Sequence, residues 1–166
     1  MQFPKERPKE YLSRLASLYS DIKSWVKPVG IEPVEYEVRL LEEAFGAYMA
    51  PALKLYFHNR IIAEVKPIGA AIIGASGRVD FVGAVSSFAV VYLEKLEKGK
   101  LRVAIPWTAG NDVPRTGQGP LLFVGVKEAG WYLIQDRAPQ KALPLNKELC
   151  LNLLESVSDH AFAQRA

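Results

Sequence analysis

The residues whose types and spacing could support catalysis lie in the segment IIAEVKP, residues 61–67. Its β-branched residues predict a strand, and residues two apart in a strand point to the same face. We therefore expect Glu64 and Lys66 to lie side by side. A carboxylate in this position could hold a divalent metal, and the ammonium group could stabilise negative charge developing on a phosphate.

An apolar strand that carries Glu-x-Lys resembles the second half of the PD-(D/E)xK nuclease motif. The resemblance covers residues 61–67 only and implies a metal-dependent nuclease that uses Glu64 and Lys66. The family places an acidic residue on the preceding strand, but residues 50–54 read APALK and contain no carboxylate. Asp80, on a later strand, would have to replace it in space. Charges on the solvent face of an edge strand also prevent aggregation, and we favour that explanation.

A second pair, Arg78 and Asp80, is expected on one strand face because it flanks Val79. The two side chains could form an ion pair that fixes the register of the sheet. Alternatively, Arg78 could bind an anion. A further alternative is a small-molecule-binding domain, in which one charged group such as Arg78 lies in an apolar pocket on the concave face of the sheet.

A long polar loop, TAGNDVPRTGQGP at residues 108–120, follows Trp107. Loops of this kind often carry function, and tryptophan is enriched at binding hot spots. We predict a contact surface there, with the side chains of Trp107, Asn111, Asp112 and Arg115.

Other catalytic patterns lack support. The segment Gly74-Ala75-Ser76-Gly77 is one residue short of a G-x-S-x-G nucleophile elbow, and only His58 and His160 could serve as its base. Two isolated histidines and Cys150 cannot supply a structural zinc site. We therefore expect neither a metal site nor a cofactor.

Helical spacing of apolar residues predicts a helix from about Lys9 to Val26, after an irregular arm at residues 1–8 and before Pro28 and Gly30. A second helix is predicted from about Pro33, which suits a first helical turn, to Pro51. Its expected buried stripe consists of Val34, Val38, Leu41, Phe45 and Tyr48. A C-terminal helix is expected after Asn146, a good N-cap.

Between these helices the period changes to that of strands. The first two, at residues 54–57 and 60–66, should be joined by a tight turn at His58-Asn59. Further strands are expected at 77–82, 88–94, 101–107, 121–126 and 131–135, and residues 88–93 should be buried on both faces. The expected fold is α+β: two N-terminal helices, a central, mainly antiparallel sheet of about six to seven strands, and one C-terminal helix.

Composition supports one globular domain over residues 1–166, with 49% hydrophobic and 23% charged residues. The longest uncharged run, residues 81–93, is too short to span a bilayer. The single cysteine and the absence of a secretory signal pattern at the N-terminus predict a cytoplasmic location.

The formal net charge is only +3 and is dispersed, which argues against a dedicated nucleic-acid binder but leaves that partner open. A basic N-terminal segment precedes an acidic one at residues 32–43, and the two would partly neutralise each other if packed together. We therefore expect a non-catalytic cytoplasmic binding or accessory protein, with another protein as its partner. The nuclease-like enzyme and the small-molecule-binding domain are the alternatives.

Overall fold

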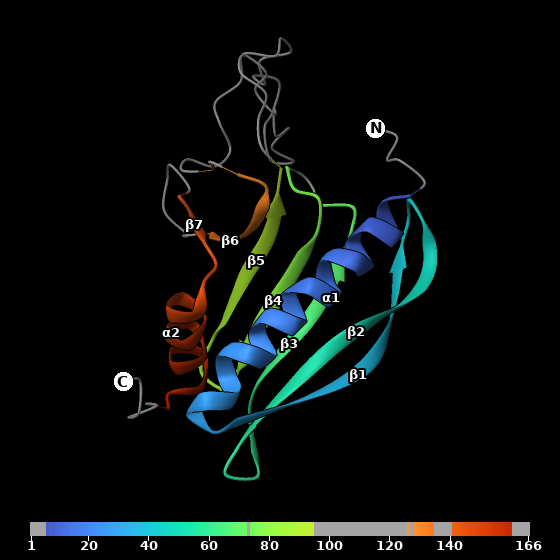
Figure 1. Cartoon of the computed structure of the whole chain (residues 1–166). Coiled ribbons are helices and arrows are strands. Elements are labelled where there is room, and N and C mark those ends of the chain that lie inside the picture. Colours follow the sequence, from blue (N-terminus) through green and yellow to red (C-terminus); the bar gives the residue numbers. More distant parts are fainter. Residues whose placement is uncertain (1–5, 73, 95–125, 127, 135–140, 161–166) are drawn as a thin grey trace.

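The computed structural model describes residues 6–72, 74–94, 126, 128–134 and 141–160. Among these residues, seven strands form one antiparallel sheet whose spatial order follows the chain, and two helices cover one of its faces (Figure 1). In chain order the elements are α1 (Arg7–Val26), the 3-10 turn η1 (Lys27–Val29), β1 (Ile31–Glu42), β2 (Gly46–Phe57), β3 (Arg60–Gly69), β4 (Arg78–Gly83), β5 (Ser87–Leu93), β6 (Gly130–Ile134), β7 (Ala142–Pro144) and α2 (Lys147–Ser158). The predicted α+β class is confirmed.

Helix α1 is held to the sheet by an apolar stripe that includes two tyrosines whose hydroxyls bond to the sheet. Tyr11, Leu15, Leu18, Tyr19, Ile22 and Val26 are all buried, which is the spacing of one helix face. The hydroxyl of Tyr11 donates a hydrogen bond to the carbonyl of Arg78 at 2.6 Å, and that of Tyr19 to the carbonyl of Pro51 at 2.7 Å. Burial raises the pKa of both phenols well above the usual value. The helix begins at Arg7, within the predicted arm.

The predicted second helix is wrong, because residues 31–57 form the antiparallel hairpin of β1 and β2. Val34, Tyr36, Val38 and Leu40 alternate with polar residues, which is also the period of a strand. Pro33 is tolerated because β1 is an edge strand, where a missing backbone donor breaks no ladder. Leu41, expected to be buried, is 75% exposed.

The tight turn predicted at His58-Asn59 is confirmed, and it joins β2 to β3. His58 and Asn59 have positive φ angles of 51° and 63°. Two successive left-handed residues define a type I′ turn, whose twist matches that of the flanking strands. The hairpin is therefore fixed locally.

The β1–β2 hairpin changes its buried face along its length. Near β3, Leu53 and Leu55 point into the core. Pairing with β3 ends at Leu53 and Val65, and farther along the hairpin the opposite parity is buried, as at Ala50. Met49, which has the parity of Leu53, is 48% exposed. Two-stranded ribbons twist more strongly than wide sheets, and this twist brings the other face of the ribbon to the core.

Glu42 ties the tip of this ribbon back to the end of β3. Its carboxylate accepts hydrogen bonds from the backbone N–H groups of Ala70, at 3.0 Å, and Ala71, at 2.8 Å. It also accepts one from the hydroxyl of Tyr48, and burial together with this bond raises the pKa of that phenol. The end of the β1–β2 ribbon that does not pair with β3 is thus held in place by charge-assisted hydrogen bonds.

The remaining strands largely match expectation. β4 and β5 lie where strands are predicted, and β5 is buried on both faces: Val90 lies in the main core, whereas Val91 and Leu93 lie in a second apolar cluster. β6 is confirmed, but no strand is predicted at β7. The strands predicted at 101–107 and 121–126 fall outside the described residues, apart from residue 126.

Helix α2 is also as predicted, and it packs closely on the end of β4. Asn146 caps it by accepting a hydrogen bond from the N–H of Leu149 at 2.8 Å. Cys150 lies on its buried face, and burial raises the pKa of the thiol to about 12. Neither described helix has the length and apolar character needed to cross a membrane.

We expect Gly83→Ala to destabilise the protein and Gly130→Ala to leave stability nearly unchanged. A Cβ on Gly83 would lie 2.2 Å from the carbonyl oxygen of Val157 in α2, whereas one on Gly130 meets nothing within 4 Å. The overpacking should lower the free energy of unfolding by about 1–3 kcal/mol. Urea denaturation of both variants measures this, and equal midpoints would contradict the close contact between α2 and β4.

Candidate functional site

The register between β3 and β4 brings the predicted candidates onto one face of the sheet. Lys66 lies directly opposite Asp80, and Glu64 lies opposite Val82. The alternating residues of these strands, such as Val65 and Phe81, are buried in the core beneath the helices. Glu64, Lys66 and Asp80 therefore lie on the face that the helices leave uncovered, called the open face below.

Glu64 is at the centre of a polar network that crosses three strands. Its Oε2 accepts a hydrogen bond from the hydroxyl of Tyr36 in β1 at 2.9 Å, and lies 3.6 Å from Lys66 Nζ. Lys54 of β2 lies opposite Glu64, with its Nζ 4.9 Å from the centre of the Tyr36 ring. The partly buried carboxylate is thus stabilised by a phenol and an ammonium group.

Arg78 and Asp80 form a separate bidentate ion pair. Arg78 Nε lies 2.8 Å from Oδ1 of Asp80, and Arg78 Nη2 lies 3.1 Å from Oδ2. This geometry matches the planar guanidinium to both carboxylate oxygens. The two groups on which an anion site or a metal site would depend are therefore engaged with each other. Together, Tyr36, Lys54, Glu64, Lys66, Arg78 and Asp80 form what we call the open-face row.

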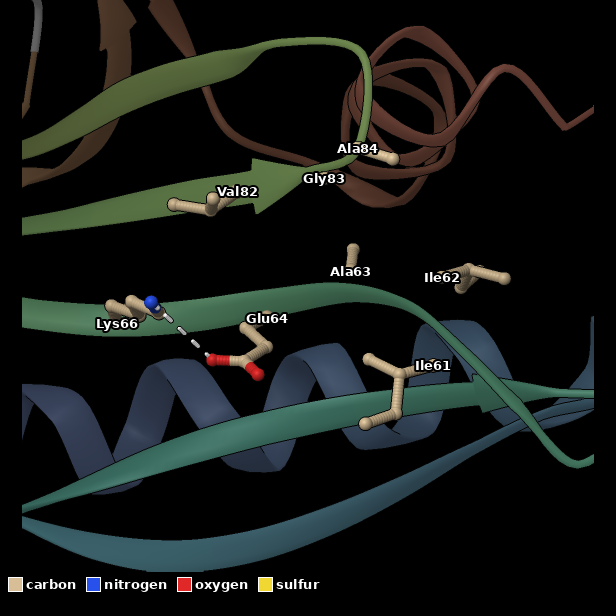
Figure 2. A pocket seen from close by; sticks show the side chains of 8 residues that line it. All are labelled: Ile61, Ile62, Ala63, Glu64, Lys66, Val82, Gly83 and Ala84. Carbon is tan, nitrogen blue, oxygen red and sulfur yellow. Dashed lines mark ion pairs between the residues drawn. The ribbon is translucent and has the colours of Figure 1, made fainter.

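A groove of about 210 Å³ lies beside the row, between β3 and β4 (Figure 2). Glu64 and Lys66 line one part of it, and the remaining lining is apolar or backbone: Ile61, Ile62, Ala63, Val82, Gly83 and Ala84. Among the described residues, Oε1 of Glu64 has no hydrogen-bond partner. The groove thus combines one available carboxylate oxygen with apolar walls.

The arrangement of these side chains does not favour a metal site. In the part of the chain that the structure describes, no three His, Cys, Asp or Glu residues gather closely enough to hold a metal ion. Glu64 has a cationic partner in Lys66, and Asp80 has one in Arg78. Glu64 and Lys66 lie on β3, an interior strand between β2 and β4 and not the edge strand expected from the sequence, so they do not protect a sheet edge. The arrangement is that of paired surface charges.

Two members of the row were missed in the sequence. Tyr36 lies in the segment interpreted as a helix, and Lys54 begins the next predicted strand. Alternation over residues 34–40 was the signal that could have placed Tyr36 on a strand face. The predicted loop residues Trp107, Asn111, Asp112 and Arg115 lie outside the described residues.

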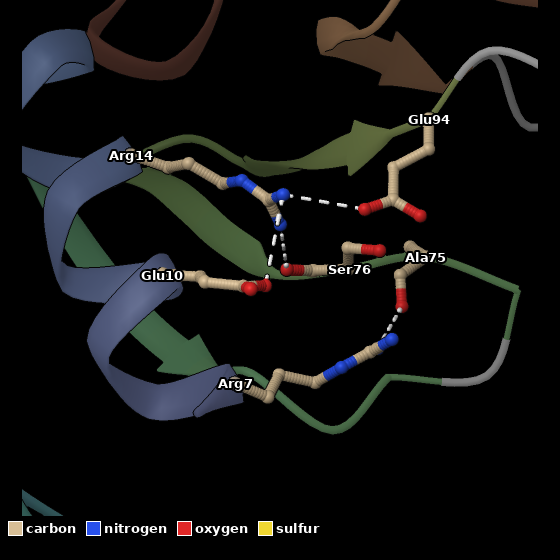
Figure 3. A network of polar contacts seen from close by, with 6 residues as sticks. All are labelled: Arg7, Glu10, Arg14, Ala75, Ser76 and Glu94. Atoms are coloured by element: carbon tan, nitrogen blue, oxygen red, sulfur yellow. Dashed lines mark hydrogen bonds and ion pairs between the residues drawn. The ribbon is translucent and has the colours of Figure 1, made fainter. Parts of the chain in front are cut away.

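A second polar cluster joins the N-terminal half of α1 to the segment before β4 (Figure 3). The guanidinium of Arg14 lies 3.2 Å from Glu94 Oε1, 3.5 Å from the carbonyl oxygen of Ser76 and 4.1 Å from the centre of the Tyr92 ring. Arg7 donates to the carbonyl of Ala75 at 3.4 Å. These contacts fasten α1 to the loop and to the end of β5.

Ser76 lies within this cluster, and its hydroxyl is fully buried without a hydrogen-bond partner among the described residues. The rings of His58 and His160 both lie near Phe57. Phe57 in turn lies next to Gly30, which follows the C-terminal end of α1, whereas Ser76 lies near the N-terminal half of this helix. A helix of twenty residues rises about 30 Å. The structure therefore does not bring either histidine to Ser76.

No protein-family model, curated protein or solved structure matches this chain.

We expect Glu64→Gln to lower the pKa of Tyr36 while leaving it above 10. Burial, followed by the hydrogen bond and charge of Glu64, raises this pKa from 10.0 to about 12. The variant removes the charge but not the burial. The folded protein holds the phenolic proton of Tyr36 more tightly than the unfolded chain does, and this difference stabilises the fold below pH 10. The stabilisation is lost as pH rises from about 10 to 12.

NMR titration of the Tyr36 ring measures this shift. Asp80→Asn is the control, because Asp80 pairs with Arg78 rather than with Tyr36. An unchanged pKa in Glu64→Gln would contradict the Tyr36–Glu64 contact.

Proposed function

We propose that this chain is a non-catalytic cytoplasmic binding protein that contacts another protein through the open face of its sheet. The observation that carries this proposal is the combination of exposed apolar side chains with charged groups already paired to one another. Val34 is 42% exposed and Ile61 is 49% exposed. Apolar groups bordered by polar ones are typical of protein interaction sites.

The size of the groove favours a protein partner over a small molecule. Pockets for small ligands usually enclose about 300–1,000 Å³, and the groove measures about 210 Å³. It suits a single side chain of a partner, whose apolar part would lie against Ile61 and Val82. A donor at its end would reach Oε1 of Glu64. Anchors of this kind often provide most of the binding energy of an interface.

The paired charges favour binding over chemistry. A general acid or base must exchange its proton with substrate, and a metal ligand must present free lone pairs. Both oxygens of Asp80 face Arg78, and Oε2 of Glu64 faces Tyr36 and Lys66, so Oε1 of Glu64 is the one oxygen of these two carboxylates without a partner among the described residues. Charges held in place by their neighbours can instead set specificity without further ordering on binding.

We expect affinity purification of the tagged full-length protein from its native lysate to yield a stoichiometric protein partner. Ile61→Glu, which places a charge in the apolar part of the groove, should reduce capture about tenfold or more. Ser20→Glu, on the exposed side of α1, makes the same change in net charge, and this matched control should capture normally.

The Trp107/Asp112/Arg115 triple alanine variant, measured in parallel, tests the loop as an additional contact. Equal capture by Ile61→Glu and the unsubstituted protein would contradict the open-face proposal. Loss of the partner in the triple variant alone would assign binding to the loop instead.

The nuclease-like enzyme is the second candidate, and the β3–β4 register favours it, since Asp80 shares a face with Glu64 and lies opposite Lys66. We expect no cleavage of nucleic acid in Mg²⁺ or Mn²⁺ above the level of the Glu64→Ala variant. Cleavage that requires Glu64 and a divalent metal would replace the binding proposal with this one.

A further inference from the structure

Among the residues that the structure describes, no strand pairs with the outer edge of β1, which is a long row of backbone groups. β1 has twelve residues and, among the described residues, pairs with β2 only. Strands usually have about 3–10 residues, and exposed edges are commonly kept short or interrupted by proline. Pro33 interrupts only the start of β1, and residues 34–42 contain no proline. This edge can therefore accept an additional strand.

Charge identifies the kind of strand that fits. β1 contains four glutamates and one arginine, a formal charge of −3, in a chain whose net charge is +3. Among the described residues, one ion pair joins the basic N-terminal segment to the acidic one, between Lys23 and Glu35 at 2.7 Å. Glu32 and Glu37 are exposed and form no ion pair with another described residue. The edge thus keeps uncompensated negative charge.

Apolar contact surface is also present on this strand. Val34 is 42% exposed and Leu41 is 75% exposed. An edge that is only protected against aggregation would carry charge at such positions. Neighbouring strands lie about 4.8 Å apart, so side chains of an added strand would pack directly on these two residues.

We infer that the β1 edge binds an extended, basic segment of a partner protein by strand addition. Backbone hydrogen bonds provide affinity in this binding mode, and alternate side chains provide specificity. Lysine or arginine side chains of the segment would face Glu32 and Glu37, and its apolar side chains would face Val34 and Leu41. This inference rests on the protein-binding function proposed above and specifies the partner.

A second copy of the chain is a poorer occupant of this edge. Pairing two β1 strands antiparallel would bring glutamates of one copy opposite or diagonal to glutamates of the other. Like charges in cross-strand positions are destabilising. The charge pattern therefore favours a heterologous basic strand.

The test uses the full chain and two synthetic peptides of the same length as β1, which consist of threonine except at four positions. Both carry valine opposite Val34 and Leu41, and opposite Glu32 and Glu37 one carries lysine and the other glutamate. Binding is measured by fluorescence anisotropy, and its position by hydrogen exchange. We expect the lysine peptide to bind and to slow exchange at β1 amides, and the glutamate peptide to do neither.

Two further variants separate strand addition from charge attraction. A lysine peptide with N-methyl groups along one edge cannot form the backbone ladder and should bind about tenfold more weakly or worse. The double variant Glu32→Lys/Glu37→Lys should lose affinity by a similar factor, whereas Asp21→Lys/Glu148→Lys, with the same change in net charge, should retain it.

The inference is overturned by an unprotected β1 in the presence of the lysine peptide, by equal binding of the glutamate or N-methylated peptide, or by a dimer in sedimentation analysis whose formation protects β1. These results leave the proposed function intact if the lysate partner is still captured and depends on Ile61. Loss of that dependence would instead remove the open-face proposal, whatever the peptides do.

Discussion

The arrangement of the whole molecule depends on how α1 is fixed across the sheet. Its two buried tyrosines donate hydrogen bonds to backbone carbonyls on separate parts of the sheet. Tyr11 bonds to Arg78, the first residue of β4, and Tyr19 bonds to Pro51 in the β1–β2 ribbon. A buried hydroxyl without a partner is unfavourable, so each contact sets the helix position as well as contributing to stability. The helix thereby joins the ribbon to the rest of the sheet. It also determines which face is covered and which stays open.

The twist of the ribbon then shapes the candidate site. Pairing between β2 and β3 ends at Leu53 and Val65, and beyond this point the ribbon turns its other face to the core. Tyr36 lies opposite Ala52, next to this change, and its hydroxyl reaches across β2 to Glu64 on β3. A flat sheet would hold β1 and β3 about 10 Å apart, two strand spacings, and only a long side chain on the shared face can bridge them. Ala52, fully buried, leaves room for that crossing.

Features specified by short stretches of sequence were predictable, and those set by distant partners were not. The stripe of α1, the His58-Asn59 turn and the Asn146 cap depend on residues a few positions apart. Residues 33–51 fit both a helical stripe and an alternating strand, and the pairing of β1 with β2 decides between them. Strand parity alone placed Glu64 beside Lys66. The position of Asp80 opposite Lys66 depends on the β3–β4 register, which the sequence does not show locally.

The same twist links the open face to the β1 edge. Val34 lies opposite Lys54 and shares a face with Tyr36, so a group that contacts Val34 from the edge is also next to the open-face row. Tyr36 is hydrogen-bonded to Glu64, which lines the groove. A strand bound at the β1 edge would therefore affect Tyr36, which positions the Glu64 carboxylate in the groove. A group bound in the groove would in turn affect the face of β1 on which an added strand packs. Because both surfaces share Tyr36, one extended partner that uses both would bind more tightly than the separate contacts suggest, provided that its chain spans the strands between them.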